Sequence, residues 1–410
     1  MSIWILPAAG APRLLAAAQL SNSVGDGAYY VCSAMYFTRV VGLSATQVGL
    51  GLTTAWAVGS LAGVPLGHLA DRRGPRGTAV LLALATAAAA VAAFLAIRTF
   101  VPFVLAACLY ATAQSGLAAA RQALLGGLVD PAARTGLLAR LQSVLNAGLA
   151  VGATLGGLAL GHGTRAGYLA VFALDALGFL ACALLLLRLP PVAPGRAEPA
   201  GEAKLAVLHD RPYAVVTLVN TVLLLRMPLL SLAIPLWIAA RAEQLTWLVS
   251  PLFVLNTVAV MLFQVRTSRA VTDLPSATRT VRRSGAVLLA ACAAFALSAA
   301  ALPRWSVAAV LVAGSVLQVI GEMMQSAGSW QLSFDLAPAR QLGQYQGFFG
   351  TGVAVARTLG PLLLTALLIT WGTPGWLLLG ALFLAAGCAM GPAARWAERT
   401  RTRPHPAVSG

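Results

Sequence analysis

Long apolar runs dominate this chain and limit what it can fold into. Only 10% of its 410 residues are charged, whereas an ordinary soluble domain has about 25%. A helix that crosses a bilayer needs about 20 mostly apolar residues, and about twelve runs reach that length. The sequence therefore predicts an all-α membrane protein with about twelve transmembrane helices. The predicted spans are 13–38, 46–70, 77–97, 100–128, 136–161, 166–188, 212–240, 245–265, 284–302, 305–335, 343–370 and 375–394.

The basic residues indicate how these helices cross the bilayer. About 20 of the 28 lie at the termini or in loops on the same side as the termini, and about five lie on the other side. This bias predicts a multi-pass protein of the plasma membrane with both termini in the cytoplasm. It also accounts for the net charge of +16, so we expect a lipid bilayer, and no nucleic acid, as the partner.

The chain also contains an internal duplication. The stretch 128–136 precedes the fifth span, and the similar stretch 335–343 precedes the eleventh. The arginine-rich segment 266–283 is expected to be a loop equivalent to the one around Asp71 in the first half. We therefore predict two pseudo-symmetric six-helix bundles. The predicted division is 1–188 for the N-terminal half, 189–211 for a cytoplasmic linker, 212–394 for the C-terminal half and 395–410 for a cytoplasmic tail.

A short charged turn, 67–76, joins the second and third spans with the sequence GHLADRRGPR. Its pattern, Gly-x-x-x-Asp-Arg-x-Gly-x-Arg, resembles the loop between helices 2 and 3 of the major facilitator superfamily of transporters. The resemblance implies two six-helix halves, alternating access, and a role for this loop in holding the outward-open arrangement. A simple cytoplasmic turn is the alternative. The residues to which the gating role is carried over are Gly67, Asp71, Arg72, Gly74 and Arg76.

Six ionisable residues fall inside predicted spans, where a charge costs about 2.5–3.5 kcal/mol even on the lenient insertion scale. They can pair with each other and hold helices together, or they can bind protons or substrate. Arg121, near the cytoplasmic end of its span, is assigned to the gating group because it can pair with Asp71 or Asp130, or extend to the membrane surface. Asp175 is expected to pair with Arg165 or with a group on another helix. The six residues are Asp26, Arg121, Asp175, Arg226, Glu322 and Arg357.

Two of these acids are candidates for proton coupling. Asp26 lies near the middle of the first span between two glycines, and that span offers no basic partner between Arg13 and Arg39. Glu322 lies near the middle of the tenth span, and the segment 321–347 resembles helix 10 and the following loop of multidrug exporters in the superfamily. Burial of a carboxyl favours its neutral form, which suits a group that must load and release a proton.

Polar and aromatic residues near these acids are candidates for a substrate cavity. Gln318, Glu322 and Gln325 are spaced to share one helical face. Arg226 and Arg357 either neutralise Glu322 or recognise an anionic substrate, and the sequence leaves both roles open. The candidate cavity residues are Asn22, Tyr29, Tyr30, Arg226, Gln318, Gln325, Trp330 and Arg357.

These patterns predict a secondary active transporter that couples efflux of small amphipathic molecules to protons. Two departures from antiporters of the superfamily weaken the support for proton-driven export. Ala153 replaces a proline in the fifth span, and Ala111 replaces an arginine before Gln114. The alternative is uptake or facilitated transport of a polar or anionic solute. We expect a monomer without enzyme activity, cofactor or metal, because the histidines lie at loops or helix ends and no Asp-rich metal motif occurs.

Overall fold

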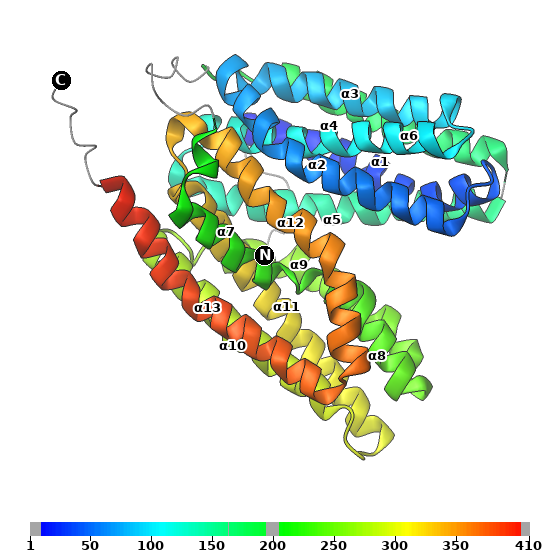
Figure 1. The fold of residues 1–410 in the computed structure, drawn as a ribbon, viewed down its shortest axis with the longest axis vertical. Helices are drawn as coiled ribbons and strands as arrows, with labels where there is room; N and C mark the ends of the chain where they lie inside the picture. Colours follow the sequence, from blue (N-terminus) through cyan, green and yellow to red (C-terminus); the bar gives the residue numbers. More distant parts are fainter. Residues whose placement is uncertain (1–9, 163, 194–204, 403–410) are drawn as a thin grey trace. The chain divides into compact units, whose positions relative to one another are not determined.

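The computed structural model describes residues 10–162, 164–193 and 205–402, and this part of the chain is built from helices (Figure 1). Nine of the described helices are long and apolar enough to cross a membrane. The segments 75–91 and Arg211–Leu224 are apolar but shorter. The prediction of an all-α membrane protein is therefore confirmed. The α-helices are α1 (Ala11–Arg39), α2 (Ala45–Arg73), α3 (Pro75–Ala96), α4 (Phe100–Leu128), α5 (Pro131–His162), α6 (Arg165–Leu187), α7 (Arg211–Leu224), α8 (Ile234–Arg241), α9 (Val249–Ser268), α10 (Leu274–Leu297), α11 (Arg304–Asp335), α12 (Leu342–Leu364) and α13 (Thr373–Thr402).

Helices occupy each of the predicted spans, but the span 212–240 is broken into two. A short π-helical segment, η2 (Leu229–Ala233), separates α7 from α8, and Arg226 lies in the turn that ends α7. Pro228 and Pro235 flank this segment. Because proline has no backbone N–H and its ring crowds the preceding turn, the regular helical hydrogen bonds cannot continue through both sites.

The arginine-rich segment 266–283, expected to be a loop, is largely helical, so this expectation was wrong. Helix α10 begins at Leu274 because Asp273 and Ser276 form a reciprocal capping box at its first turn. The side-chain hydrogen bond from Ser276, and then the bond from its backbone N–H, lower the pKa of Asp273 below its ordinary value. Arg279, Arg282 and Arg283 therefore project from a helix that begins before its apolar part.

The described chain separates into two compact units. Unit 1 comprises Met1–Leu205 and Pro338–Ala354, and unit 2 comprises Ala206–Ala337 and Val355–Gly410. The first part of α12 thus belongs to unit 1 and the rest to unit 2. Residues 194–204 of the predicted linker and 403–410 of the predicted tail lie outside the described residues. The two six-helix halves stay a prediction.

In unit 1, α1 packs against α5 and α6, α2 packs against α4, and α3 packs against α4 and α6. Glycines permit the close approach of α1 and α5: a Cβ on Gly152 would overlap the carbonyl oxygen of Val24, and one on Gly27 would overlap that of Leu149. Such small-residue contacts let helices pack tightly where lipid supplies little hydrophobic driving force.

In unit 2, α10 packs against α11 and α13, α13 packs against α7, and α11 packs against α9. Its core holds Trp237 and Trp376 edge to face, with ring centroids 5.7 Å apart and planes at 80°. The buried indole N–H of Trp237 donates to Ser298 Oγ at 2.9 Å, so its polar end is satisfied.

Candidate functional site

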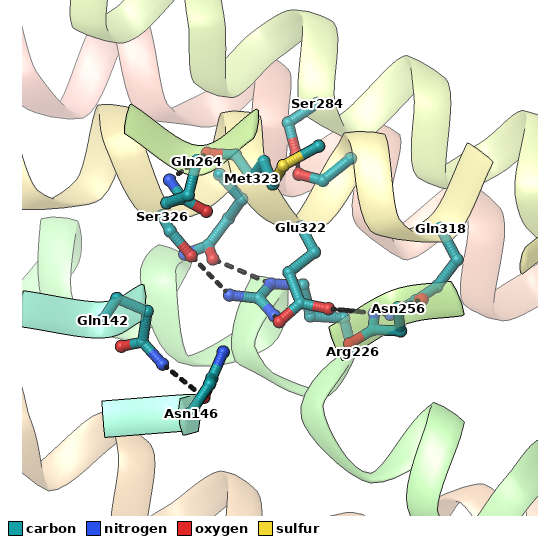
Figure 2. A network of polar contacts seen from close by, with 12 residues as sticks. Gln142, Asn146, Arg226, Asn256, Gln264, Ser284, Gln318, Glu322, Met323 and Ser326 are labelled. Atoms are coloured by element: carbon teal, nitrogen blue, oxygen red, sulfur yellow. Dashed lines mark hydrogen bonds and ion pairs between the residues drawn. The ribbon is translucent and has the colours of Figure 1, made fainter. Parts of the chain in front are cut away.

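A polar network in unit 2 centres on Arg226 and Glu322 (Figure 2). Arg226 Nη1 and Glu322 Oε1 form an ion pair at 2.9 Å, and the two side chains are 7% and 25% exposed. Arg226 Nε donates to Gln325 Oε1 at 2.9 Å, and Nη2 donates to Ser326 Oγ at 2.8 Å. Glu322, Gln325 and Ser326 all come from α11, so one turn of this helix receives the guanidinium.

The network continues in both directions from the ion pair. Asn256 of α9 donates to Glu322 Oε2 at 3.1 Å, and Gln318 donates to the same oxygen at 3.3 Å. Gln325 Nε2 donates to Asn220 Oδ1 of α7 at 2.8 Å. The predicted polar face of Gln318, Glu322 and Gln325 is therefore brought together in the structure, with Arg226 on it. Asn220 and Asn256 were not among the sequence candidates, although an asparagine inside an apolar run is a usable signal.

The two arginines predicted for this site lie in different surroundings. Arg226 contacts Glu322, which is one of the two roles left open by the sequence. Arg357 is exposed on α12, in the part that belongs to unit 2, and is not among the described partners of Arg226. Trp330, also predicted to line a cavity, is half-buried on α11 about two turns beyond Glu322.

A second polar cluster lies in unit 1, between α1, α4 and α6. The Tyr110 hydroxyl lies 3.0 Å from Asp26 Oδ1 and 3.1 Å from Asp175 Oδ2. Gln114 Nε2 also donates to Asp26 Oδ1, at 2.6 Å. Asp26, Tyr110 and Asp175 are all buried. The sequence singled out Asp26 for this region but did not predict Tyr110 or Gln114 as partners, and the partner of Asp175 in the structure is Tyr110.

Aromatic side chains and Arg121 surround this cluster. Tyr29 is buried and stacks on Tyr110, with ring centroids 4.9 Å apart. Tyr30, one residue along α1, is 45% exposed. Arg121 Nη1 lies 3.4 Å from the side-chain amide of Asn22, which is itself buried. The predicted residues Asn22, Tyr29 and Arg121 therefore lie on helices that build the Asp26 cluster.

The charged turn after α2 contacts the start of α12 within unit 1. Asp71 Oδ1 accepts a hydrogen bond from the backbone N–H of Gly343 at 2.7 Å, and Oδ2 accepts one from Gln344 at 2.9 Å. These two N–H groups lie in the first turn of α12 and have no partner within the helix, so Asp71 satisfies them. Its negative charge also faces the positive end of the α12 dipole. A Cβ on Gly67 would overlap the carbonyl oxygen of Gly343, so glycine is required where the two helices cross.

The other residues of this turn shape it. Gly74 ends α2 and precedes α3 with a φ of 95°, a conformation that L side chains rarely adopt. Arg76 Nη2 donates to the carbonyl oxygen of Leu187 at the end of α6, at 2.6 Å. Arg72 is exposed. The turn therefore links the ends of α2, α3, α6 and α12 in unit 1.

Comparison with known proteins identifies the family to which this chain belongs. The sequence matches the family model of the Major Facilitator Superfamily over residues 15–361. The chain belongs to the Major Facilitator Superfamily. The superfamily consists of transporters, and its members' helical bundles agree with the architecture described above. The sequence has no significant match among curated proteins.

Solved structures share the fold of this superfamily member at low sequence identity. A bacterial homologue of the iron transporter ferroportin, in an outward-facing state, has a TM-score of 0.75 at 15% identity, covering 95% of this chain and 99% of its own. The human organic anion transporter MFSD10 has a TM-score of 0.71 at 15% identity, covering 92% and 98%. The E. coli fucose:proton symporter FucP has a TM-score of 0.65 at 14% identity, covering 94% and 98%. These similarities show the fold.

Among the residues that the structure describes, no group of three or more His, Cys, Asp or Glu side chains is arranged to hold a metal ion. The chemistry available at the two clusters is instead that of carboxyl groups, amides, hydroxyls and one buried guanidinium. Such groups bind protons, and they recognise polar or charged parts of a solute.

Proposed function

We propose that this superfamily member is a proton-coupled secondary active transporter that exports small amphipathic molecules by alternating access. The observation that carries the proposal is the Arg226–Glu322 pair, held at 2.9 Å between spans of unit 2. A bundle that served only as a scaffold would gain little from it, because well-packed apolar residues are often as stabilising as a buried ion pair. Ionisable groups within membrane spans more often mark the path of a substrate or ion.

The geometry supports a specific role for Glu322. Protonation would remove the negative charge of Glu322, so that only neutral acceptors, among them Gln325 and Ser326, face the guanidinium of Arg226. The attraction of Arg226 to Glu322 is then weaker, as are the hydrogen bonds that Gln318 and Asn256 donate to Glu322, and an anionic partner can compete for Arg226. Proton loading and substrate release thereby act on one set of side chains. Asp26 is the second proposed proton site, and its cluster is in unit 1.

The contact of Asp71 with the start of α12 supports the proposed gating role of the turn 67–76. Opening this contact exposes two backbone donors and one carboxylate, so water must replace two charge-assisted hydrogen bonds at the helix end. A contact of this kind stabilises one arrangement of α2 and α12 and is replaced by solvent in another.

An exchange of one proton for one neutral solute across one pH unit sustains about a tenfold gradient, since one unit equals about 1.4 kcal/mol.

The alternative proposal is uptake or facilitated transport of a polar or anionic solute. Arg226 supports it, since a guanidinium released from Glu322 binds carboxylates or phosphates well. Two proteins of the same fold support it as well, one an organic anion transporter and the other a fucose:proton symporter. Under either proposal the chain works as a monomer in the plasma membrane with both termini cytoplasmic, and its partners are protons, a small solute and lipid.

Transport into proteoliposomes with an imposed pH gradient tests the proposal. A fluorescent amphipathic cation and a fluorescent organic anion serve as probes, and Glu322→Gln and Asp26→Asn are compared with the native protein. Glu398→Gln, which changes an exposed acid of α13, is the matched control. We expect gradient-driven movement of the cation in the native protein and control, and its loss in both site variants. Movement independent of the gradient would instead identify a uniporter, and movement of the anion alone would favour the alternative.

A further inference from the structure

The contacts of Tyr110 indicate how many protons the cluster in unit 1 holds. A phenol hydroxyl carries one hydrogen, so it donates to one carboxylate oxygen at a time. Tyr110 lies 3.0 Å from Asp26 Oδ1 and 3.1 Å from Asp175 Oδ2, both hydrogen-bond distances. Both contacts are full hydrogen bonds if a carboxyl group donates to the phenol oxygen while the phenol donates to the other acid. With both acids ionised, the two carboxylates would have to share one hydrogen, or one of them would face a lone pair of the hydroxyl, so this geometry favours a proton on one of the two acids.

The surroundings of the two acids differ in a way that places this proton. Asp26 Oδ1 accepts a short bond from Gln114 in addition to that of Tyr110, and both donors favour the ionised form. Asp175 is 0% exposed, and its Oδ1 has no hydrogen-bond partner. That oxygen faces the backbone of α1, since a Cβ on Gly25 would lie 2.8 Å from it. An ionised carboxylate would leave charge on an unsatisfied oxygen at this position, whereas a neutral acid leaves only a weak acceptor there.

The other titratable groups around the pair do not replace this proton. Helix α1 adds Tyr29 and Tyr30, α4 adds Arg121, and α6 adds Cys182, which interacts with Arg121. Helix α5 meets α1 here through the segment 148–157, which contains no titratable residue. In α3, which packs on α6, the one titratable residue is Arg76, bonded to the far end of α6 at Leu187. Arg121 is thus a cation near the cluster, and it interacts with Cys182.

We propose that Asp175, Tyr110 and Asp26 form a proton-binding relay that holds one exchangeable proton, resting on Asp175. In this state Asp175 Oδ2–H donates to the Tyr110 oxygen, and Tyr110 O–H donates to ionised Asp26 Oδ1. Transfer proceeds by two coupled shifts: the Asp175 proton moves to the Tyr110 oxygen as the Tyr110 proton moves to Asp26. One proton then passes from Asp175 to Asp26, Tyr110 is unchanged, and the total charge is conserved. The relay rests on the proposed proton coupling for its role in transport, but its proton is detectable without transport.

Infrared spectroscopy of the purified full-length protein tests the relay, because the C=O stretch of a protonated carboxylic acid is separate from carboxylate bands. At a near-physiological pH of about 7.5, we expect one such band from a buried acid in the native protein. The band should shift in D₂O as the proton exchanges. Asp175→Asn removes the band, and Glu322→Gln leaves it in place. Tyr110→Phe keeps both acids and retains the band at higher wavenumber, because the acid loses its acceptor. Size-exclusion chromatography of each variant verifies that it is folded.

Several results would overturn this assignment. They are the absence of the band from the native protein, its survival in Asp175→Asn, its loss in Asp26→Asn but not in Asp175→Asn, and its failure to shift in D₂O. An unmoved band in folded Tyr110→Phe also contradicts the relay, since the acid then was not bonded to Tyr110. A band that behaves as expected in a protein whose transport ignores the pH gradient would support the relay's proton and refute the proposed coupling, so the two failures are distinguishable.

Discussion

Removing both members of the Arg226–Glu322 pair is expected to destabilise unit 2 by less than the sum of the two single removals. Arg226→Met deletes a guanidinium whose side chain is 7% exposed and leaves Glu322 with Asn256 and Gln318 as donors. Glu322→Gln leaves Arg226 charged but keeps an acceptor oxygen beside it. The double variant carries neither charge. Because an unpaired charge in a membrane span is costly, the two substitutions are expected to be strongly non-additive.

The contacts set the expected size of each effect. Breaking a buried pair by removing one partner costs about 3–5 kcal/mol, and we take the lower end, about 3 kcal/mol, for Arg226→Met because Glu322 is 25% exposed. Glu322→Gln is expected to cost about 2 kcal/mol, since Arg226 keeps Gln325 and Ser326. The double variant loses the hydrogen bonds from Arg226 to Gln325 and Ser326, at about 1 kcal/mol each, but leaves no unpaired charge. The sum of the single effects is then about 5 kcal/mol, the double effect is about 2 kcal/mol, and the coupling energy is about 3 kcal/mol.

Equilibrium unfolding in mixed micelles titrated with a denaturing detergent measures these free energies for the full chain. Arg269→Met, at an exposed arginine near the end of α9, is the matched control and is expected to change the free energy of unfolding by less than about 0.5 kcal/mol. A double variant whose loss equals the sum of the single losses would refute the reasoning. It would mean that Arg226 and Glu322 act independently and that their contact does not neutralise either charge.

Three further predictions concern single contacts. Gly25→Ala places a Cβ 2.6 Å from Asp175 Cα and should cost about 1–3 kcal/mol in the same unfolding assay. The control Gly49→Ala, whose Cβ has nothing within 4 Å, should cost nothing, and equal effects would contradict the close approach of α1 and α6. Asp71→Asn keeps one of the two acceptors for the start of α12, but it loses the charge and turns an amide N–H group toward the second backbone donor. We therefore expect about 1–2 kcal/mol of destabilisation and altered transport rates in proteoliposomes, with a larger effect for Asp71→Ala; an unchanged Asp71→Ala would refute the capping role. The lowered pKa of Asp273 means that its cap stabilises the fold above the unfolded-state pKa and is lost as pH falls through the folded-state pKa, so acid unfolding monitored by circular dichroism should show less pH dependence below about pH 4 in Asp273→Asn than in the native protein.

Local sequence signals were sufficient for the helices and for part of the candidate site. The apolar runs predicted the positions of the helices because lipid requires continuous apolar length and internal backbone hydrogen bonding. Glu322 and Gln318 were placed on one face because helical spacing alone relates residues four apart. The turn around Asp71 was singled out by its sequence pattern, but its contact with the start of α12 required the structure.

The misjudged parts depended on signals that were either overlooked or not local. The start of α10 was available in the sequence, because Asp273 and Ser276 have the spacing of a capping box, but the density of arginines suggested a loop. The partners of Asp26 were not available in this way. Tyr110 and Asp175 are 84 and 149 residues away from it, with Tyr110 65 residues from Asp175, and they meet Asp26 through the packing of α1 with α6 and the position of α4. Periodicity assigns a residue to a helical face, but it does not say which face of another helix lies opposite.

The two polar clusters balance their buried charge in different ways, and this difference decides how each responds to pH. In unit 2 a guanidinium neutralises Glu322, so the pair carries no net charge when both groups are ionised. In unit 1 two carboxyl groups share one hydroxyl, and in the proposed relay a bound proton neutralises one of them. Gaining a proton creates an unpaired cation in unit 2, whereas losing one creates an unpaired anion in unit 1. In the proposed scheme, loss of the shared proton disturbs the cluster of unit 1, whereas protonation of Glu322 disturbs the ion pair of unit 2, so the two clusters respond to opposite changes in proton occupancy.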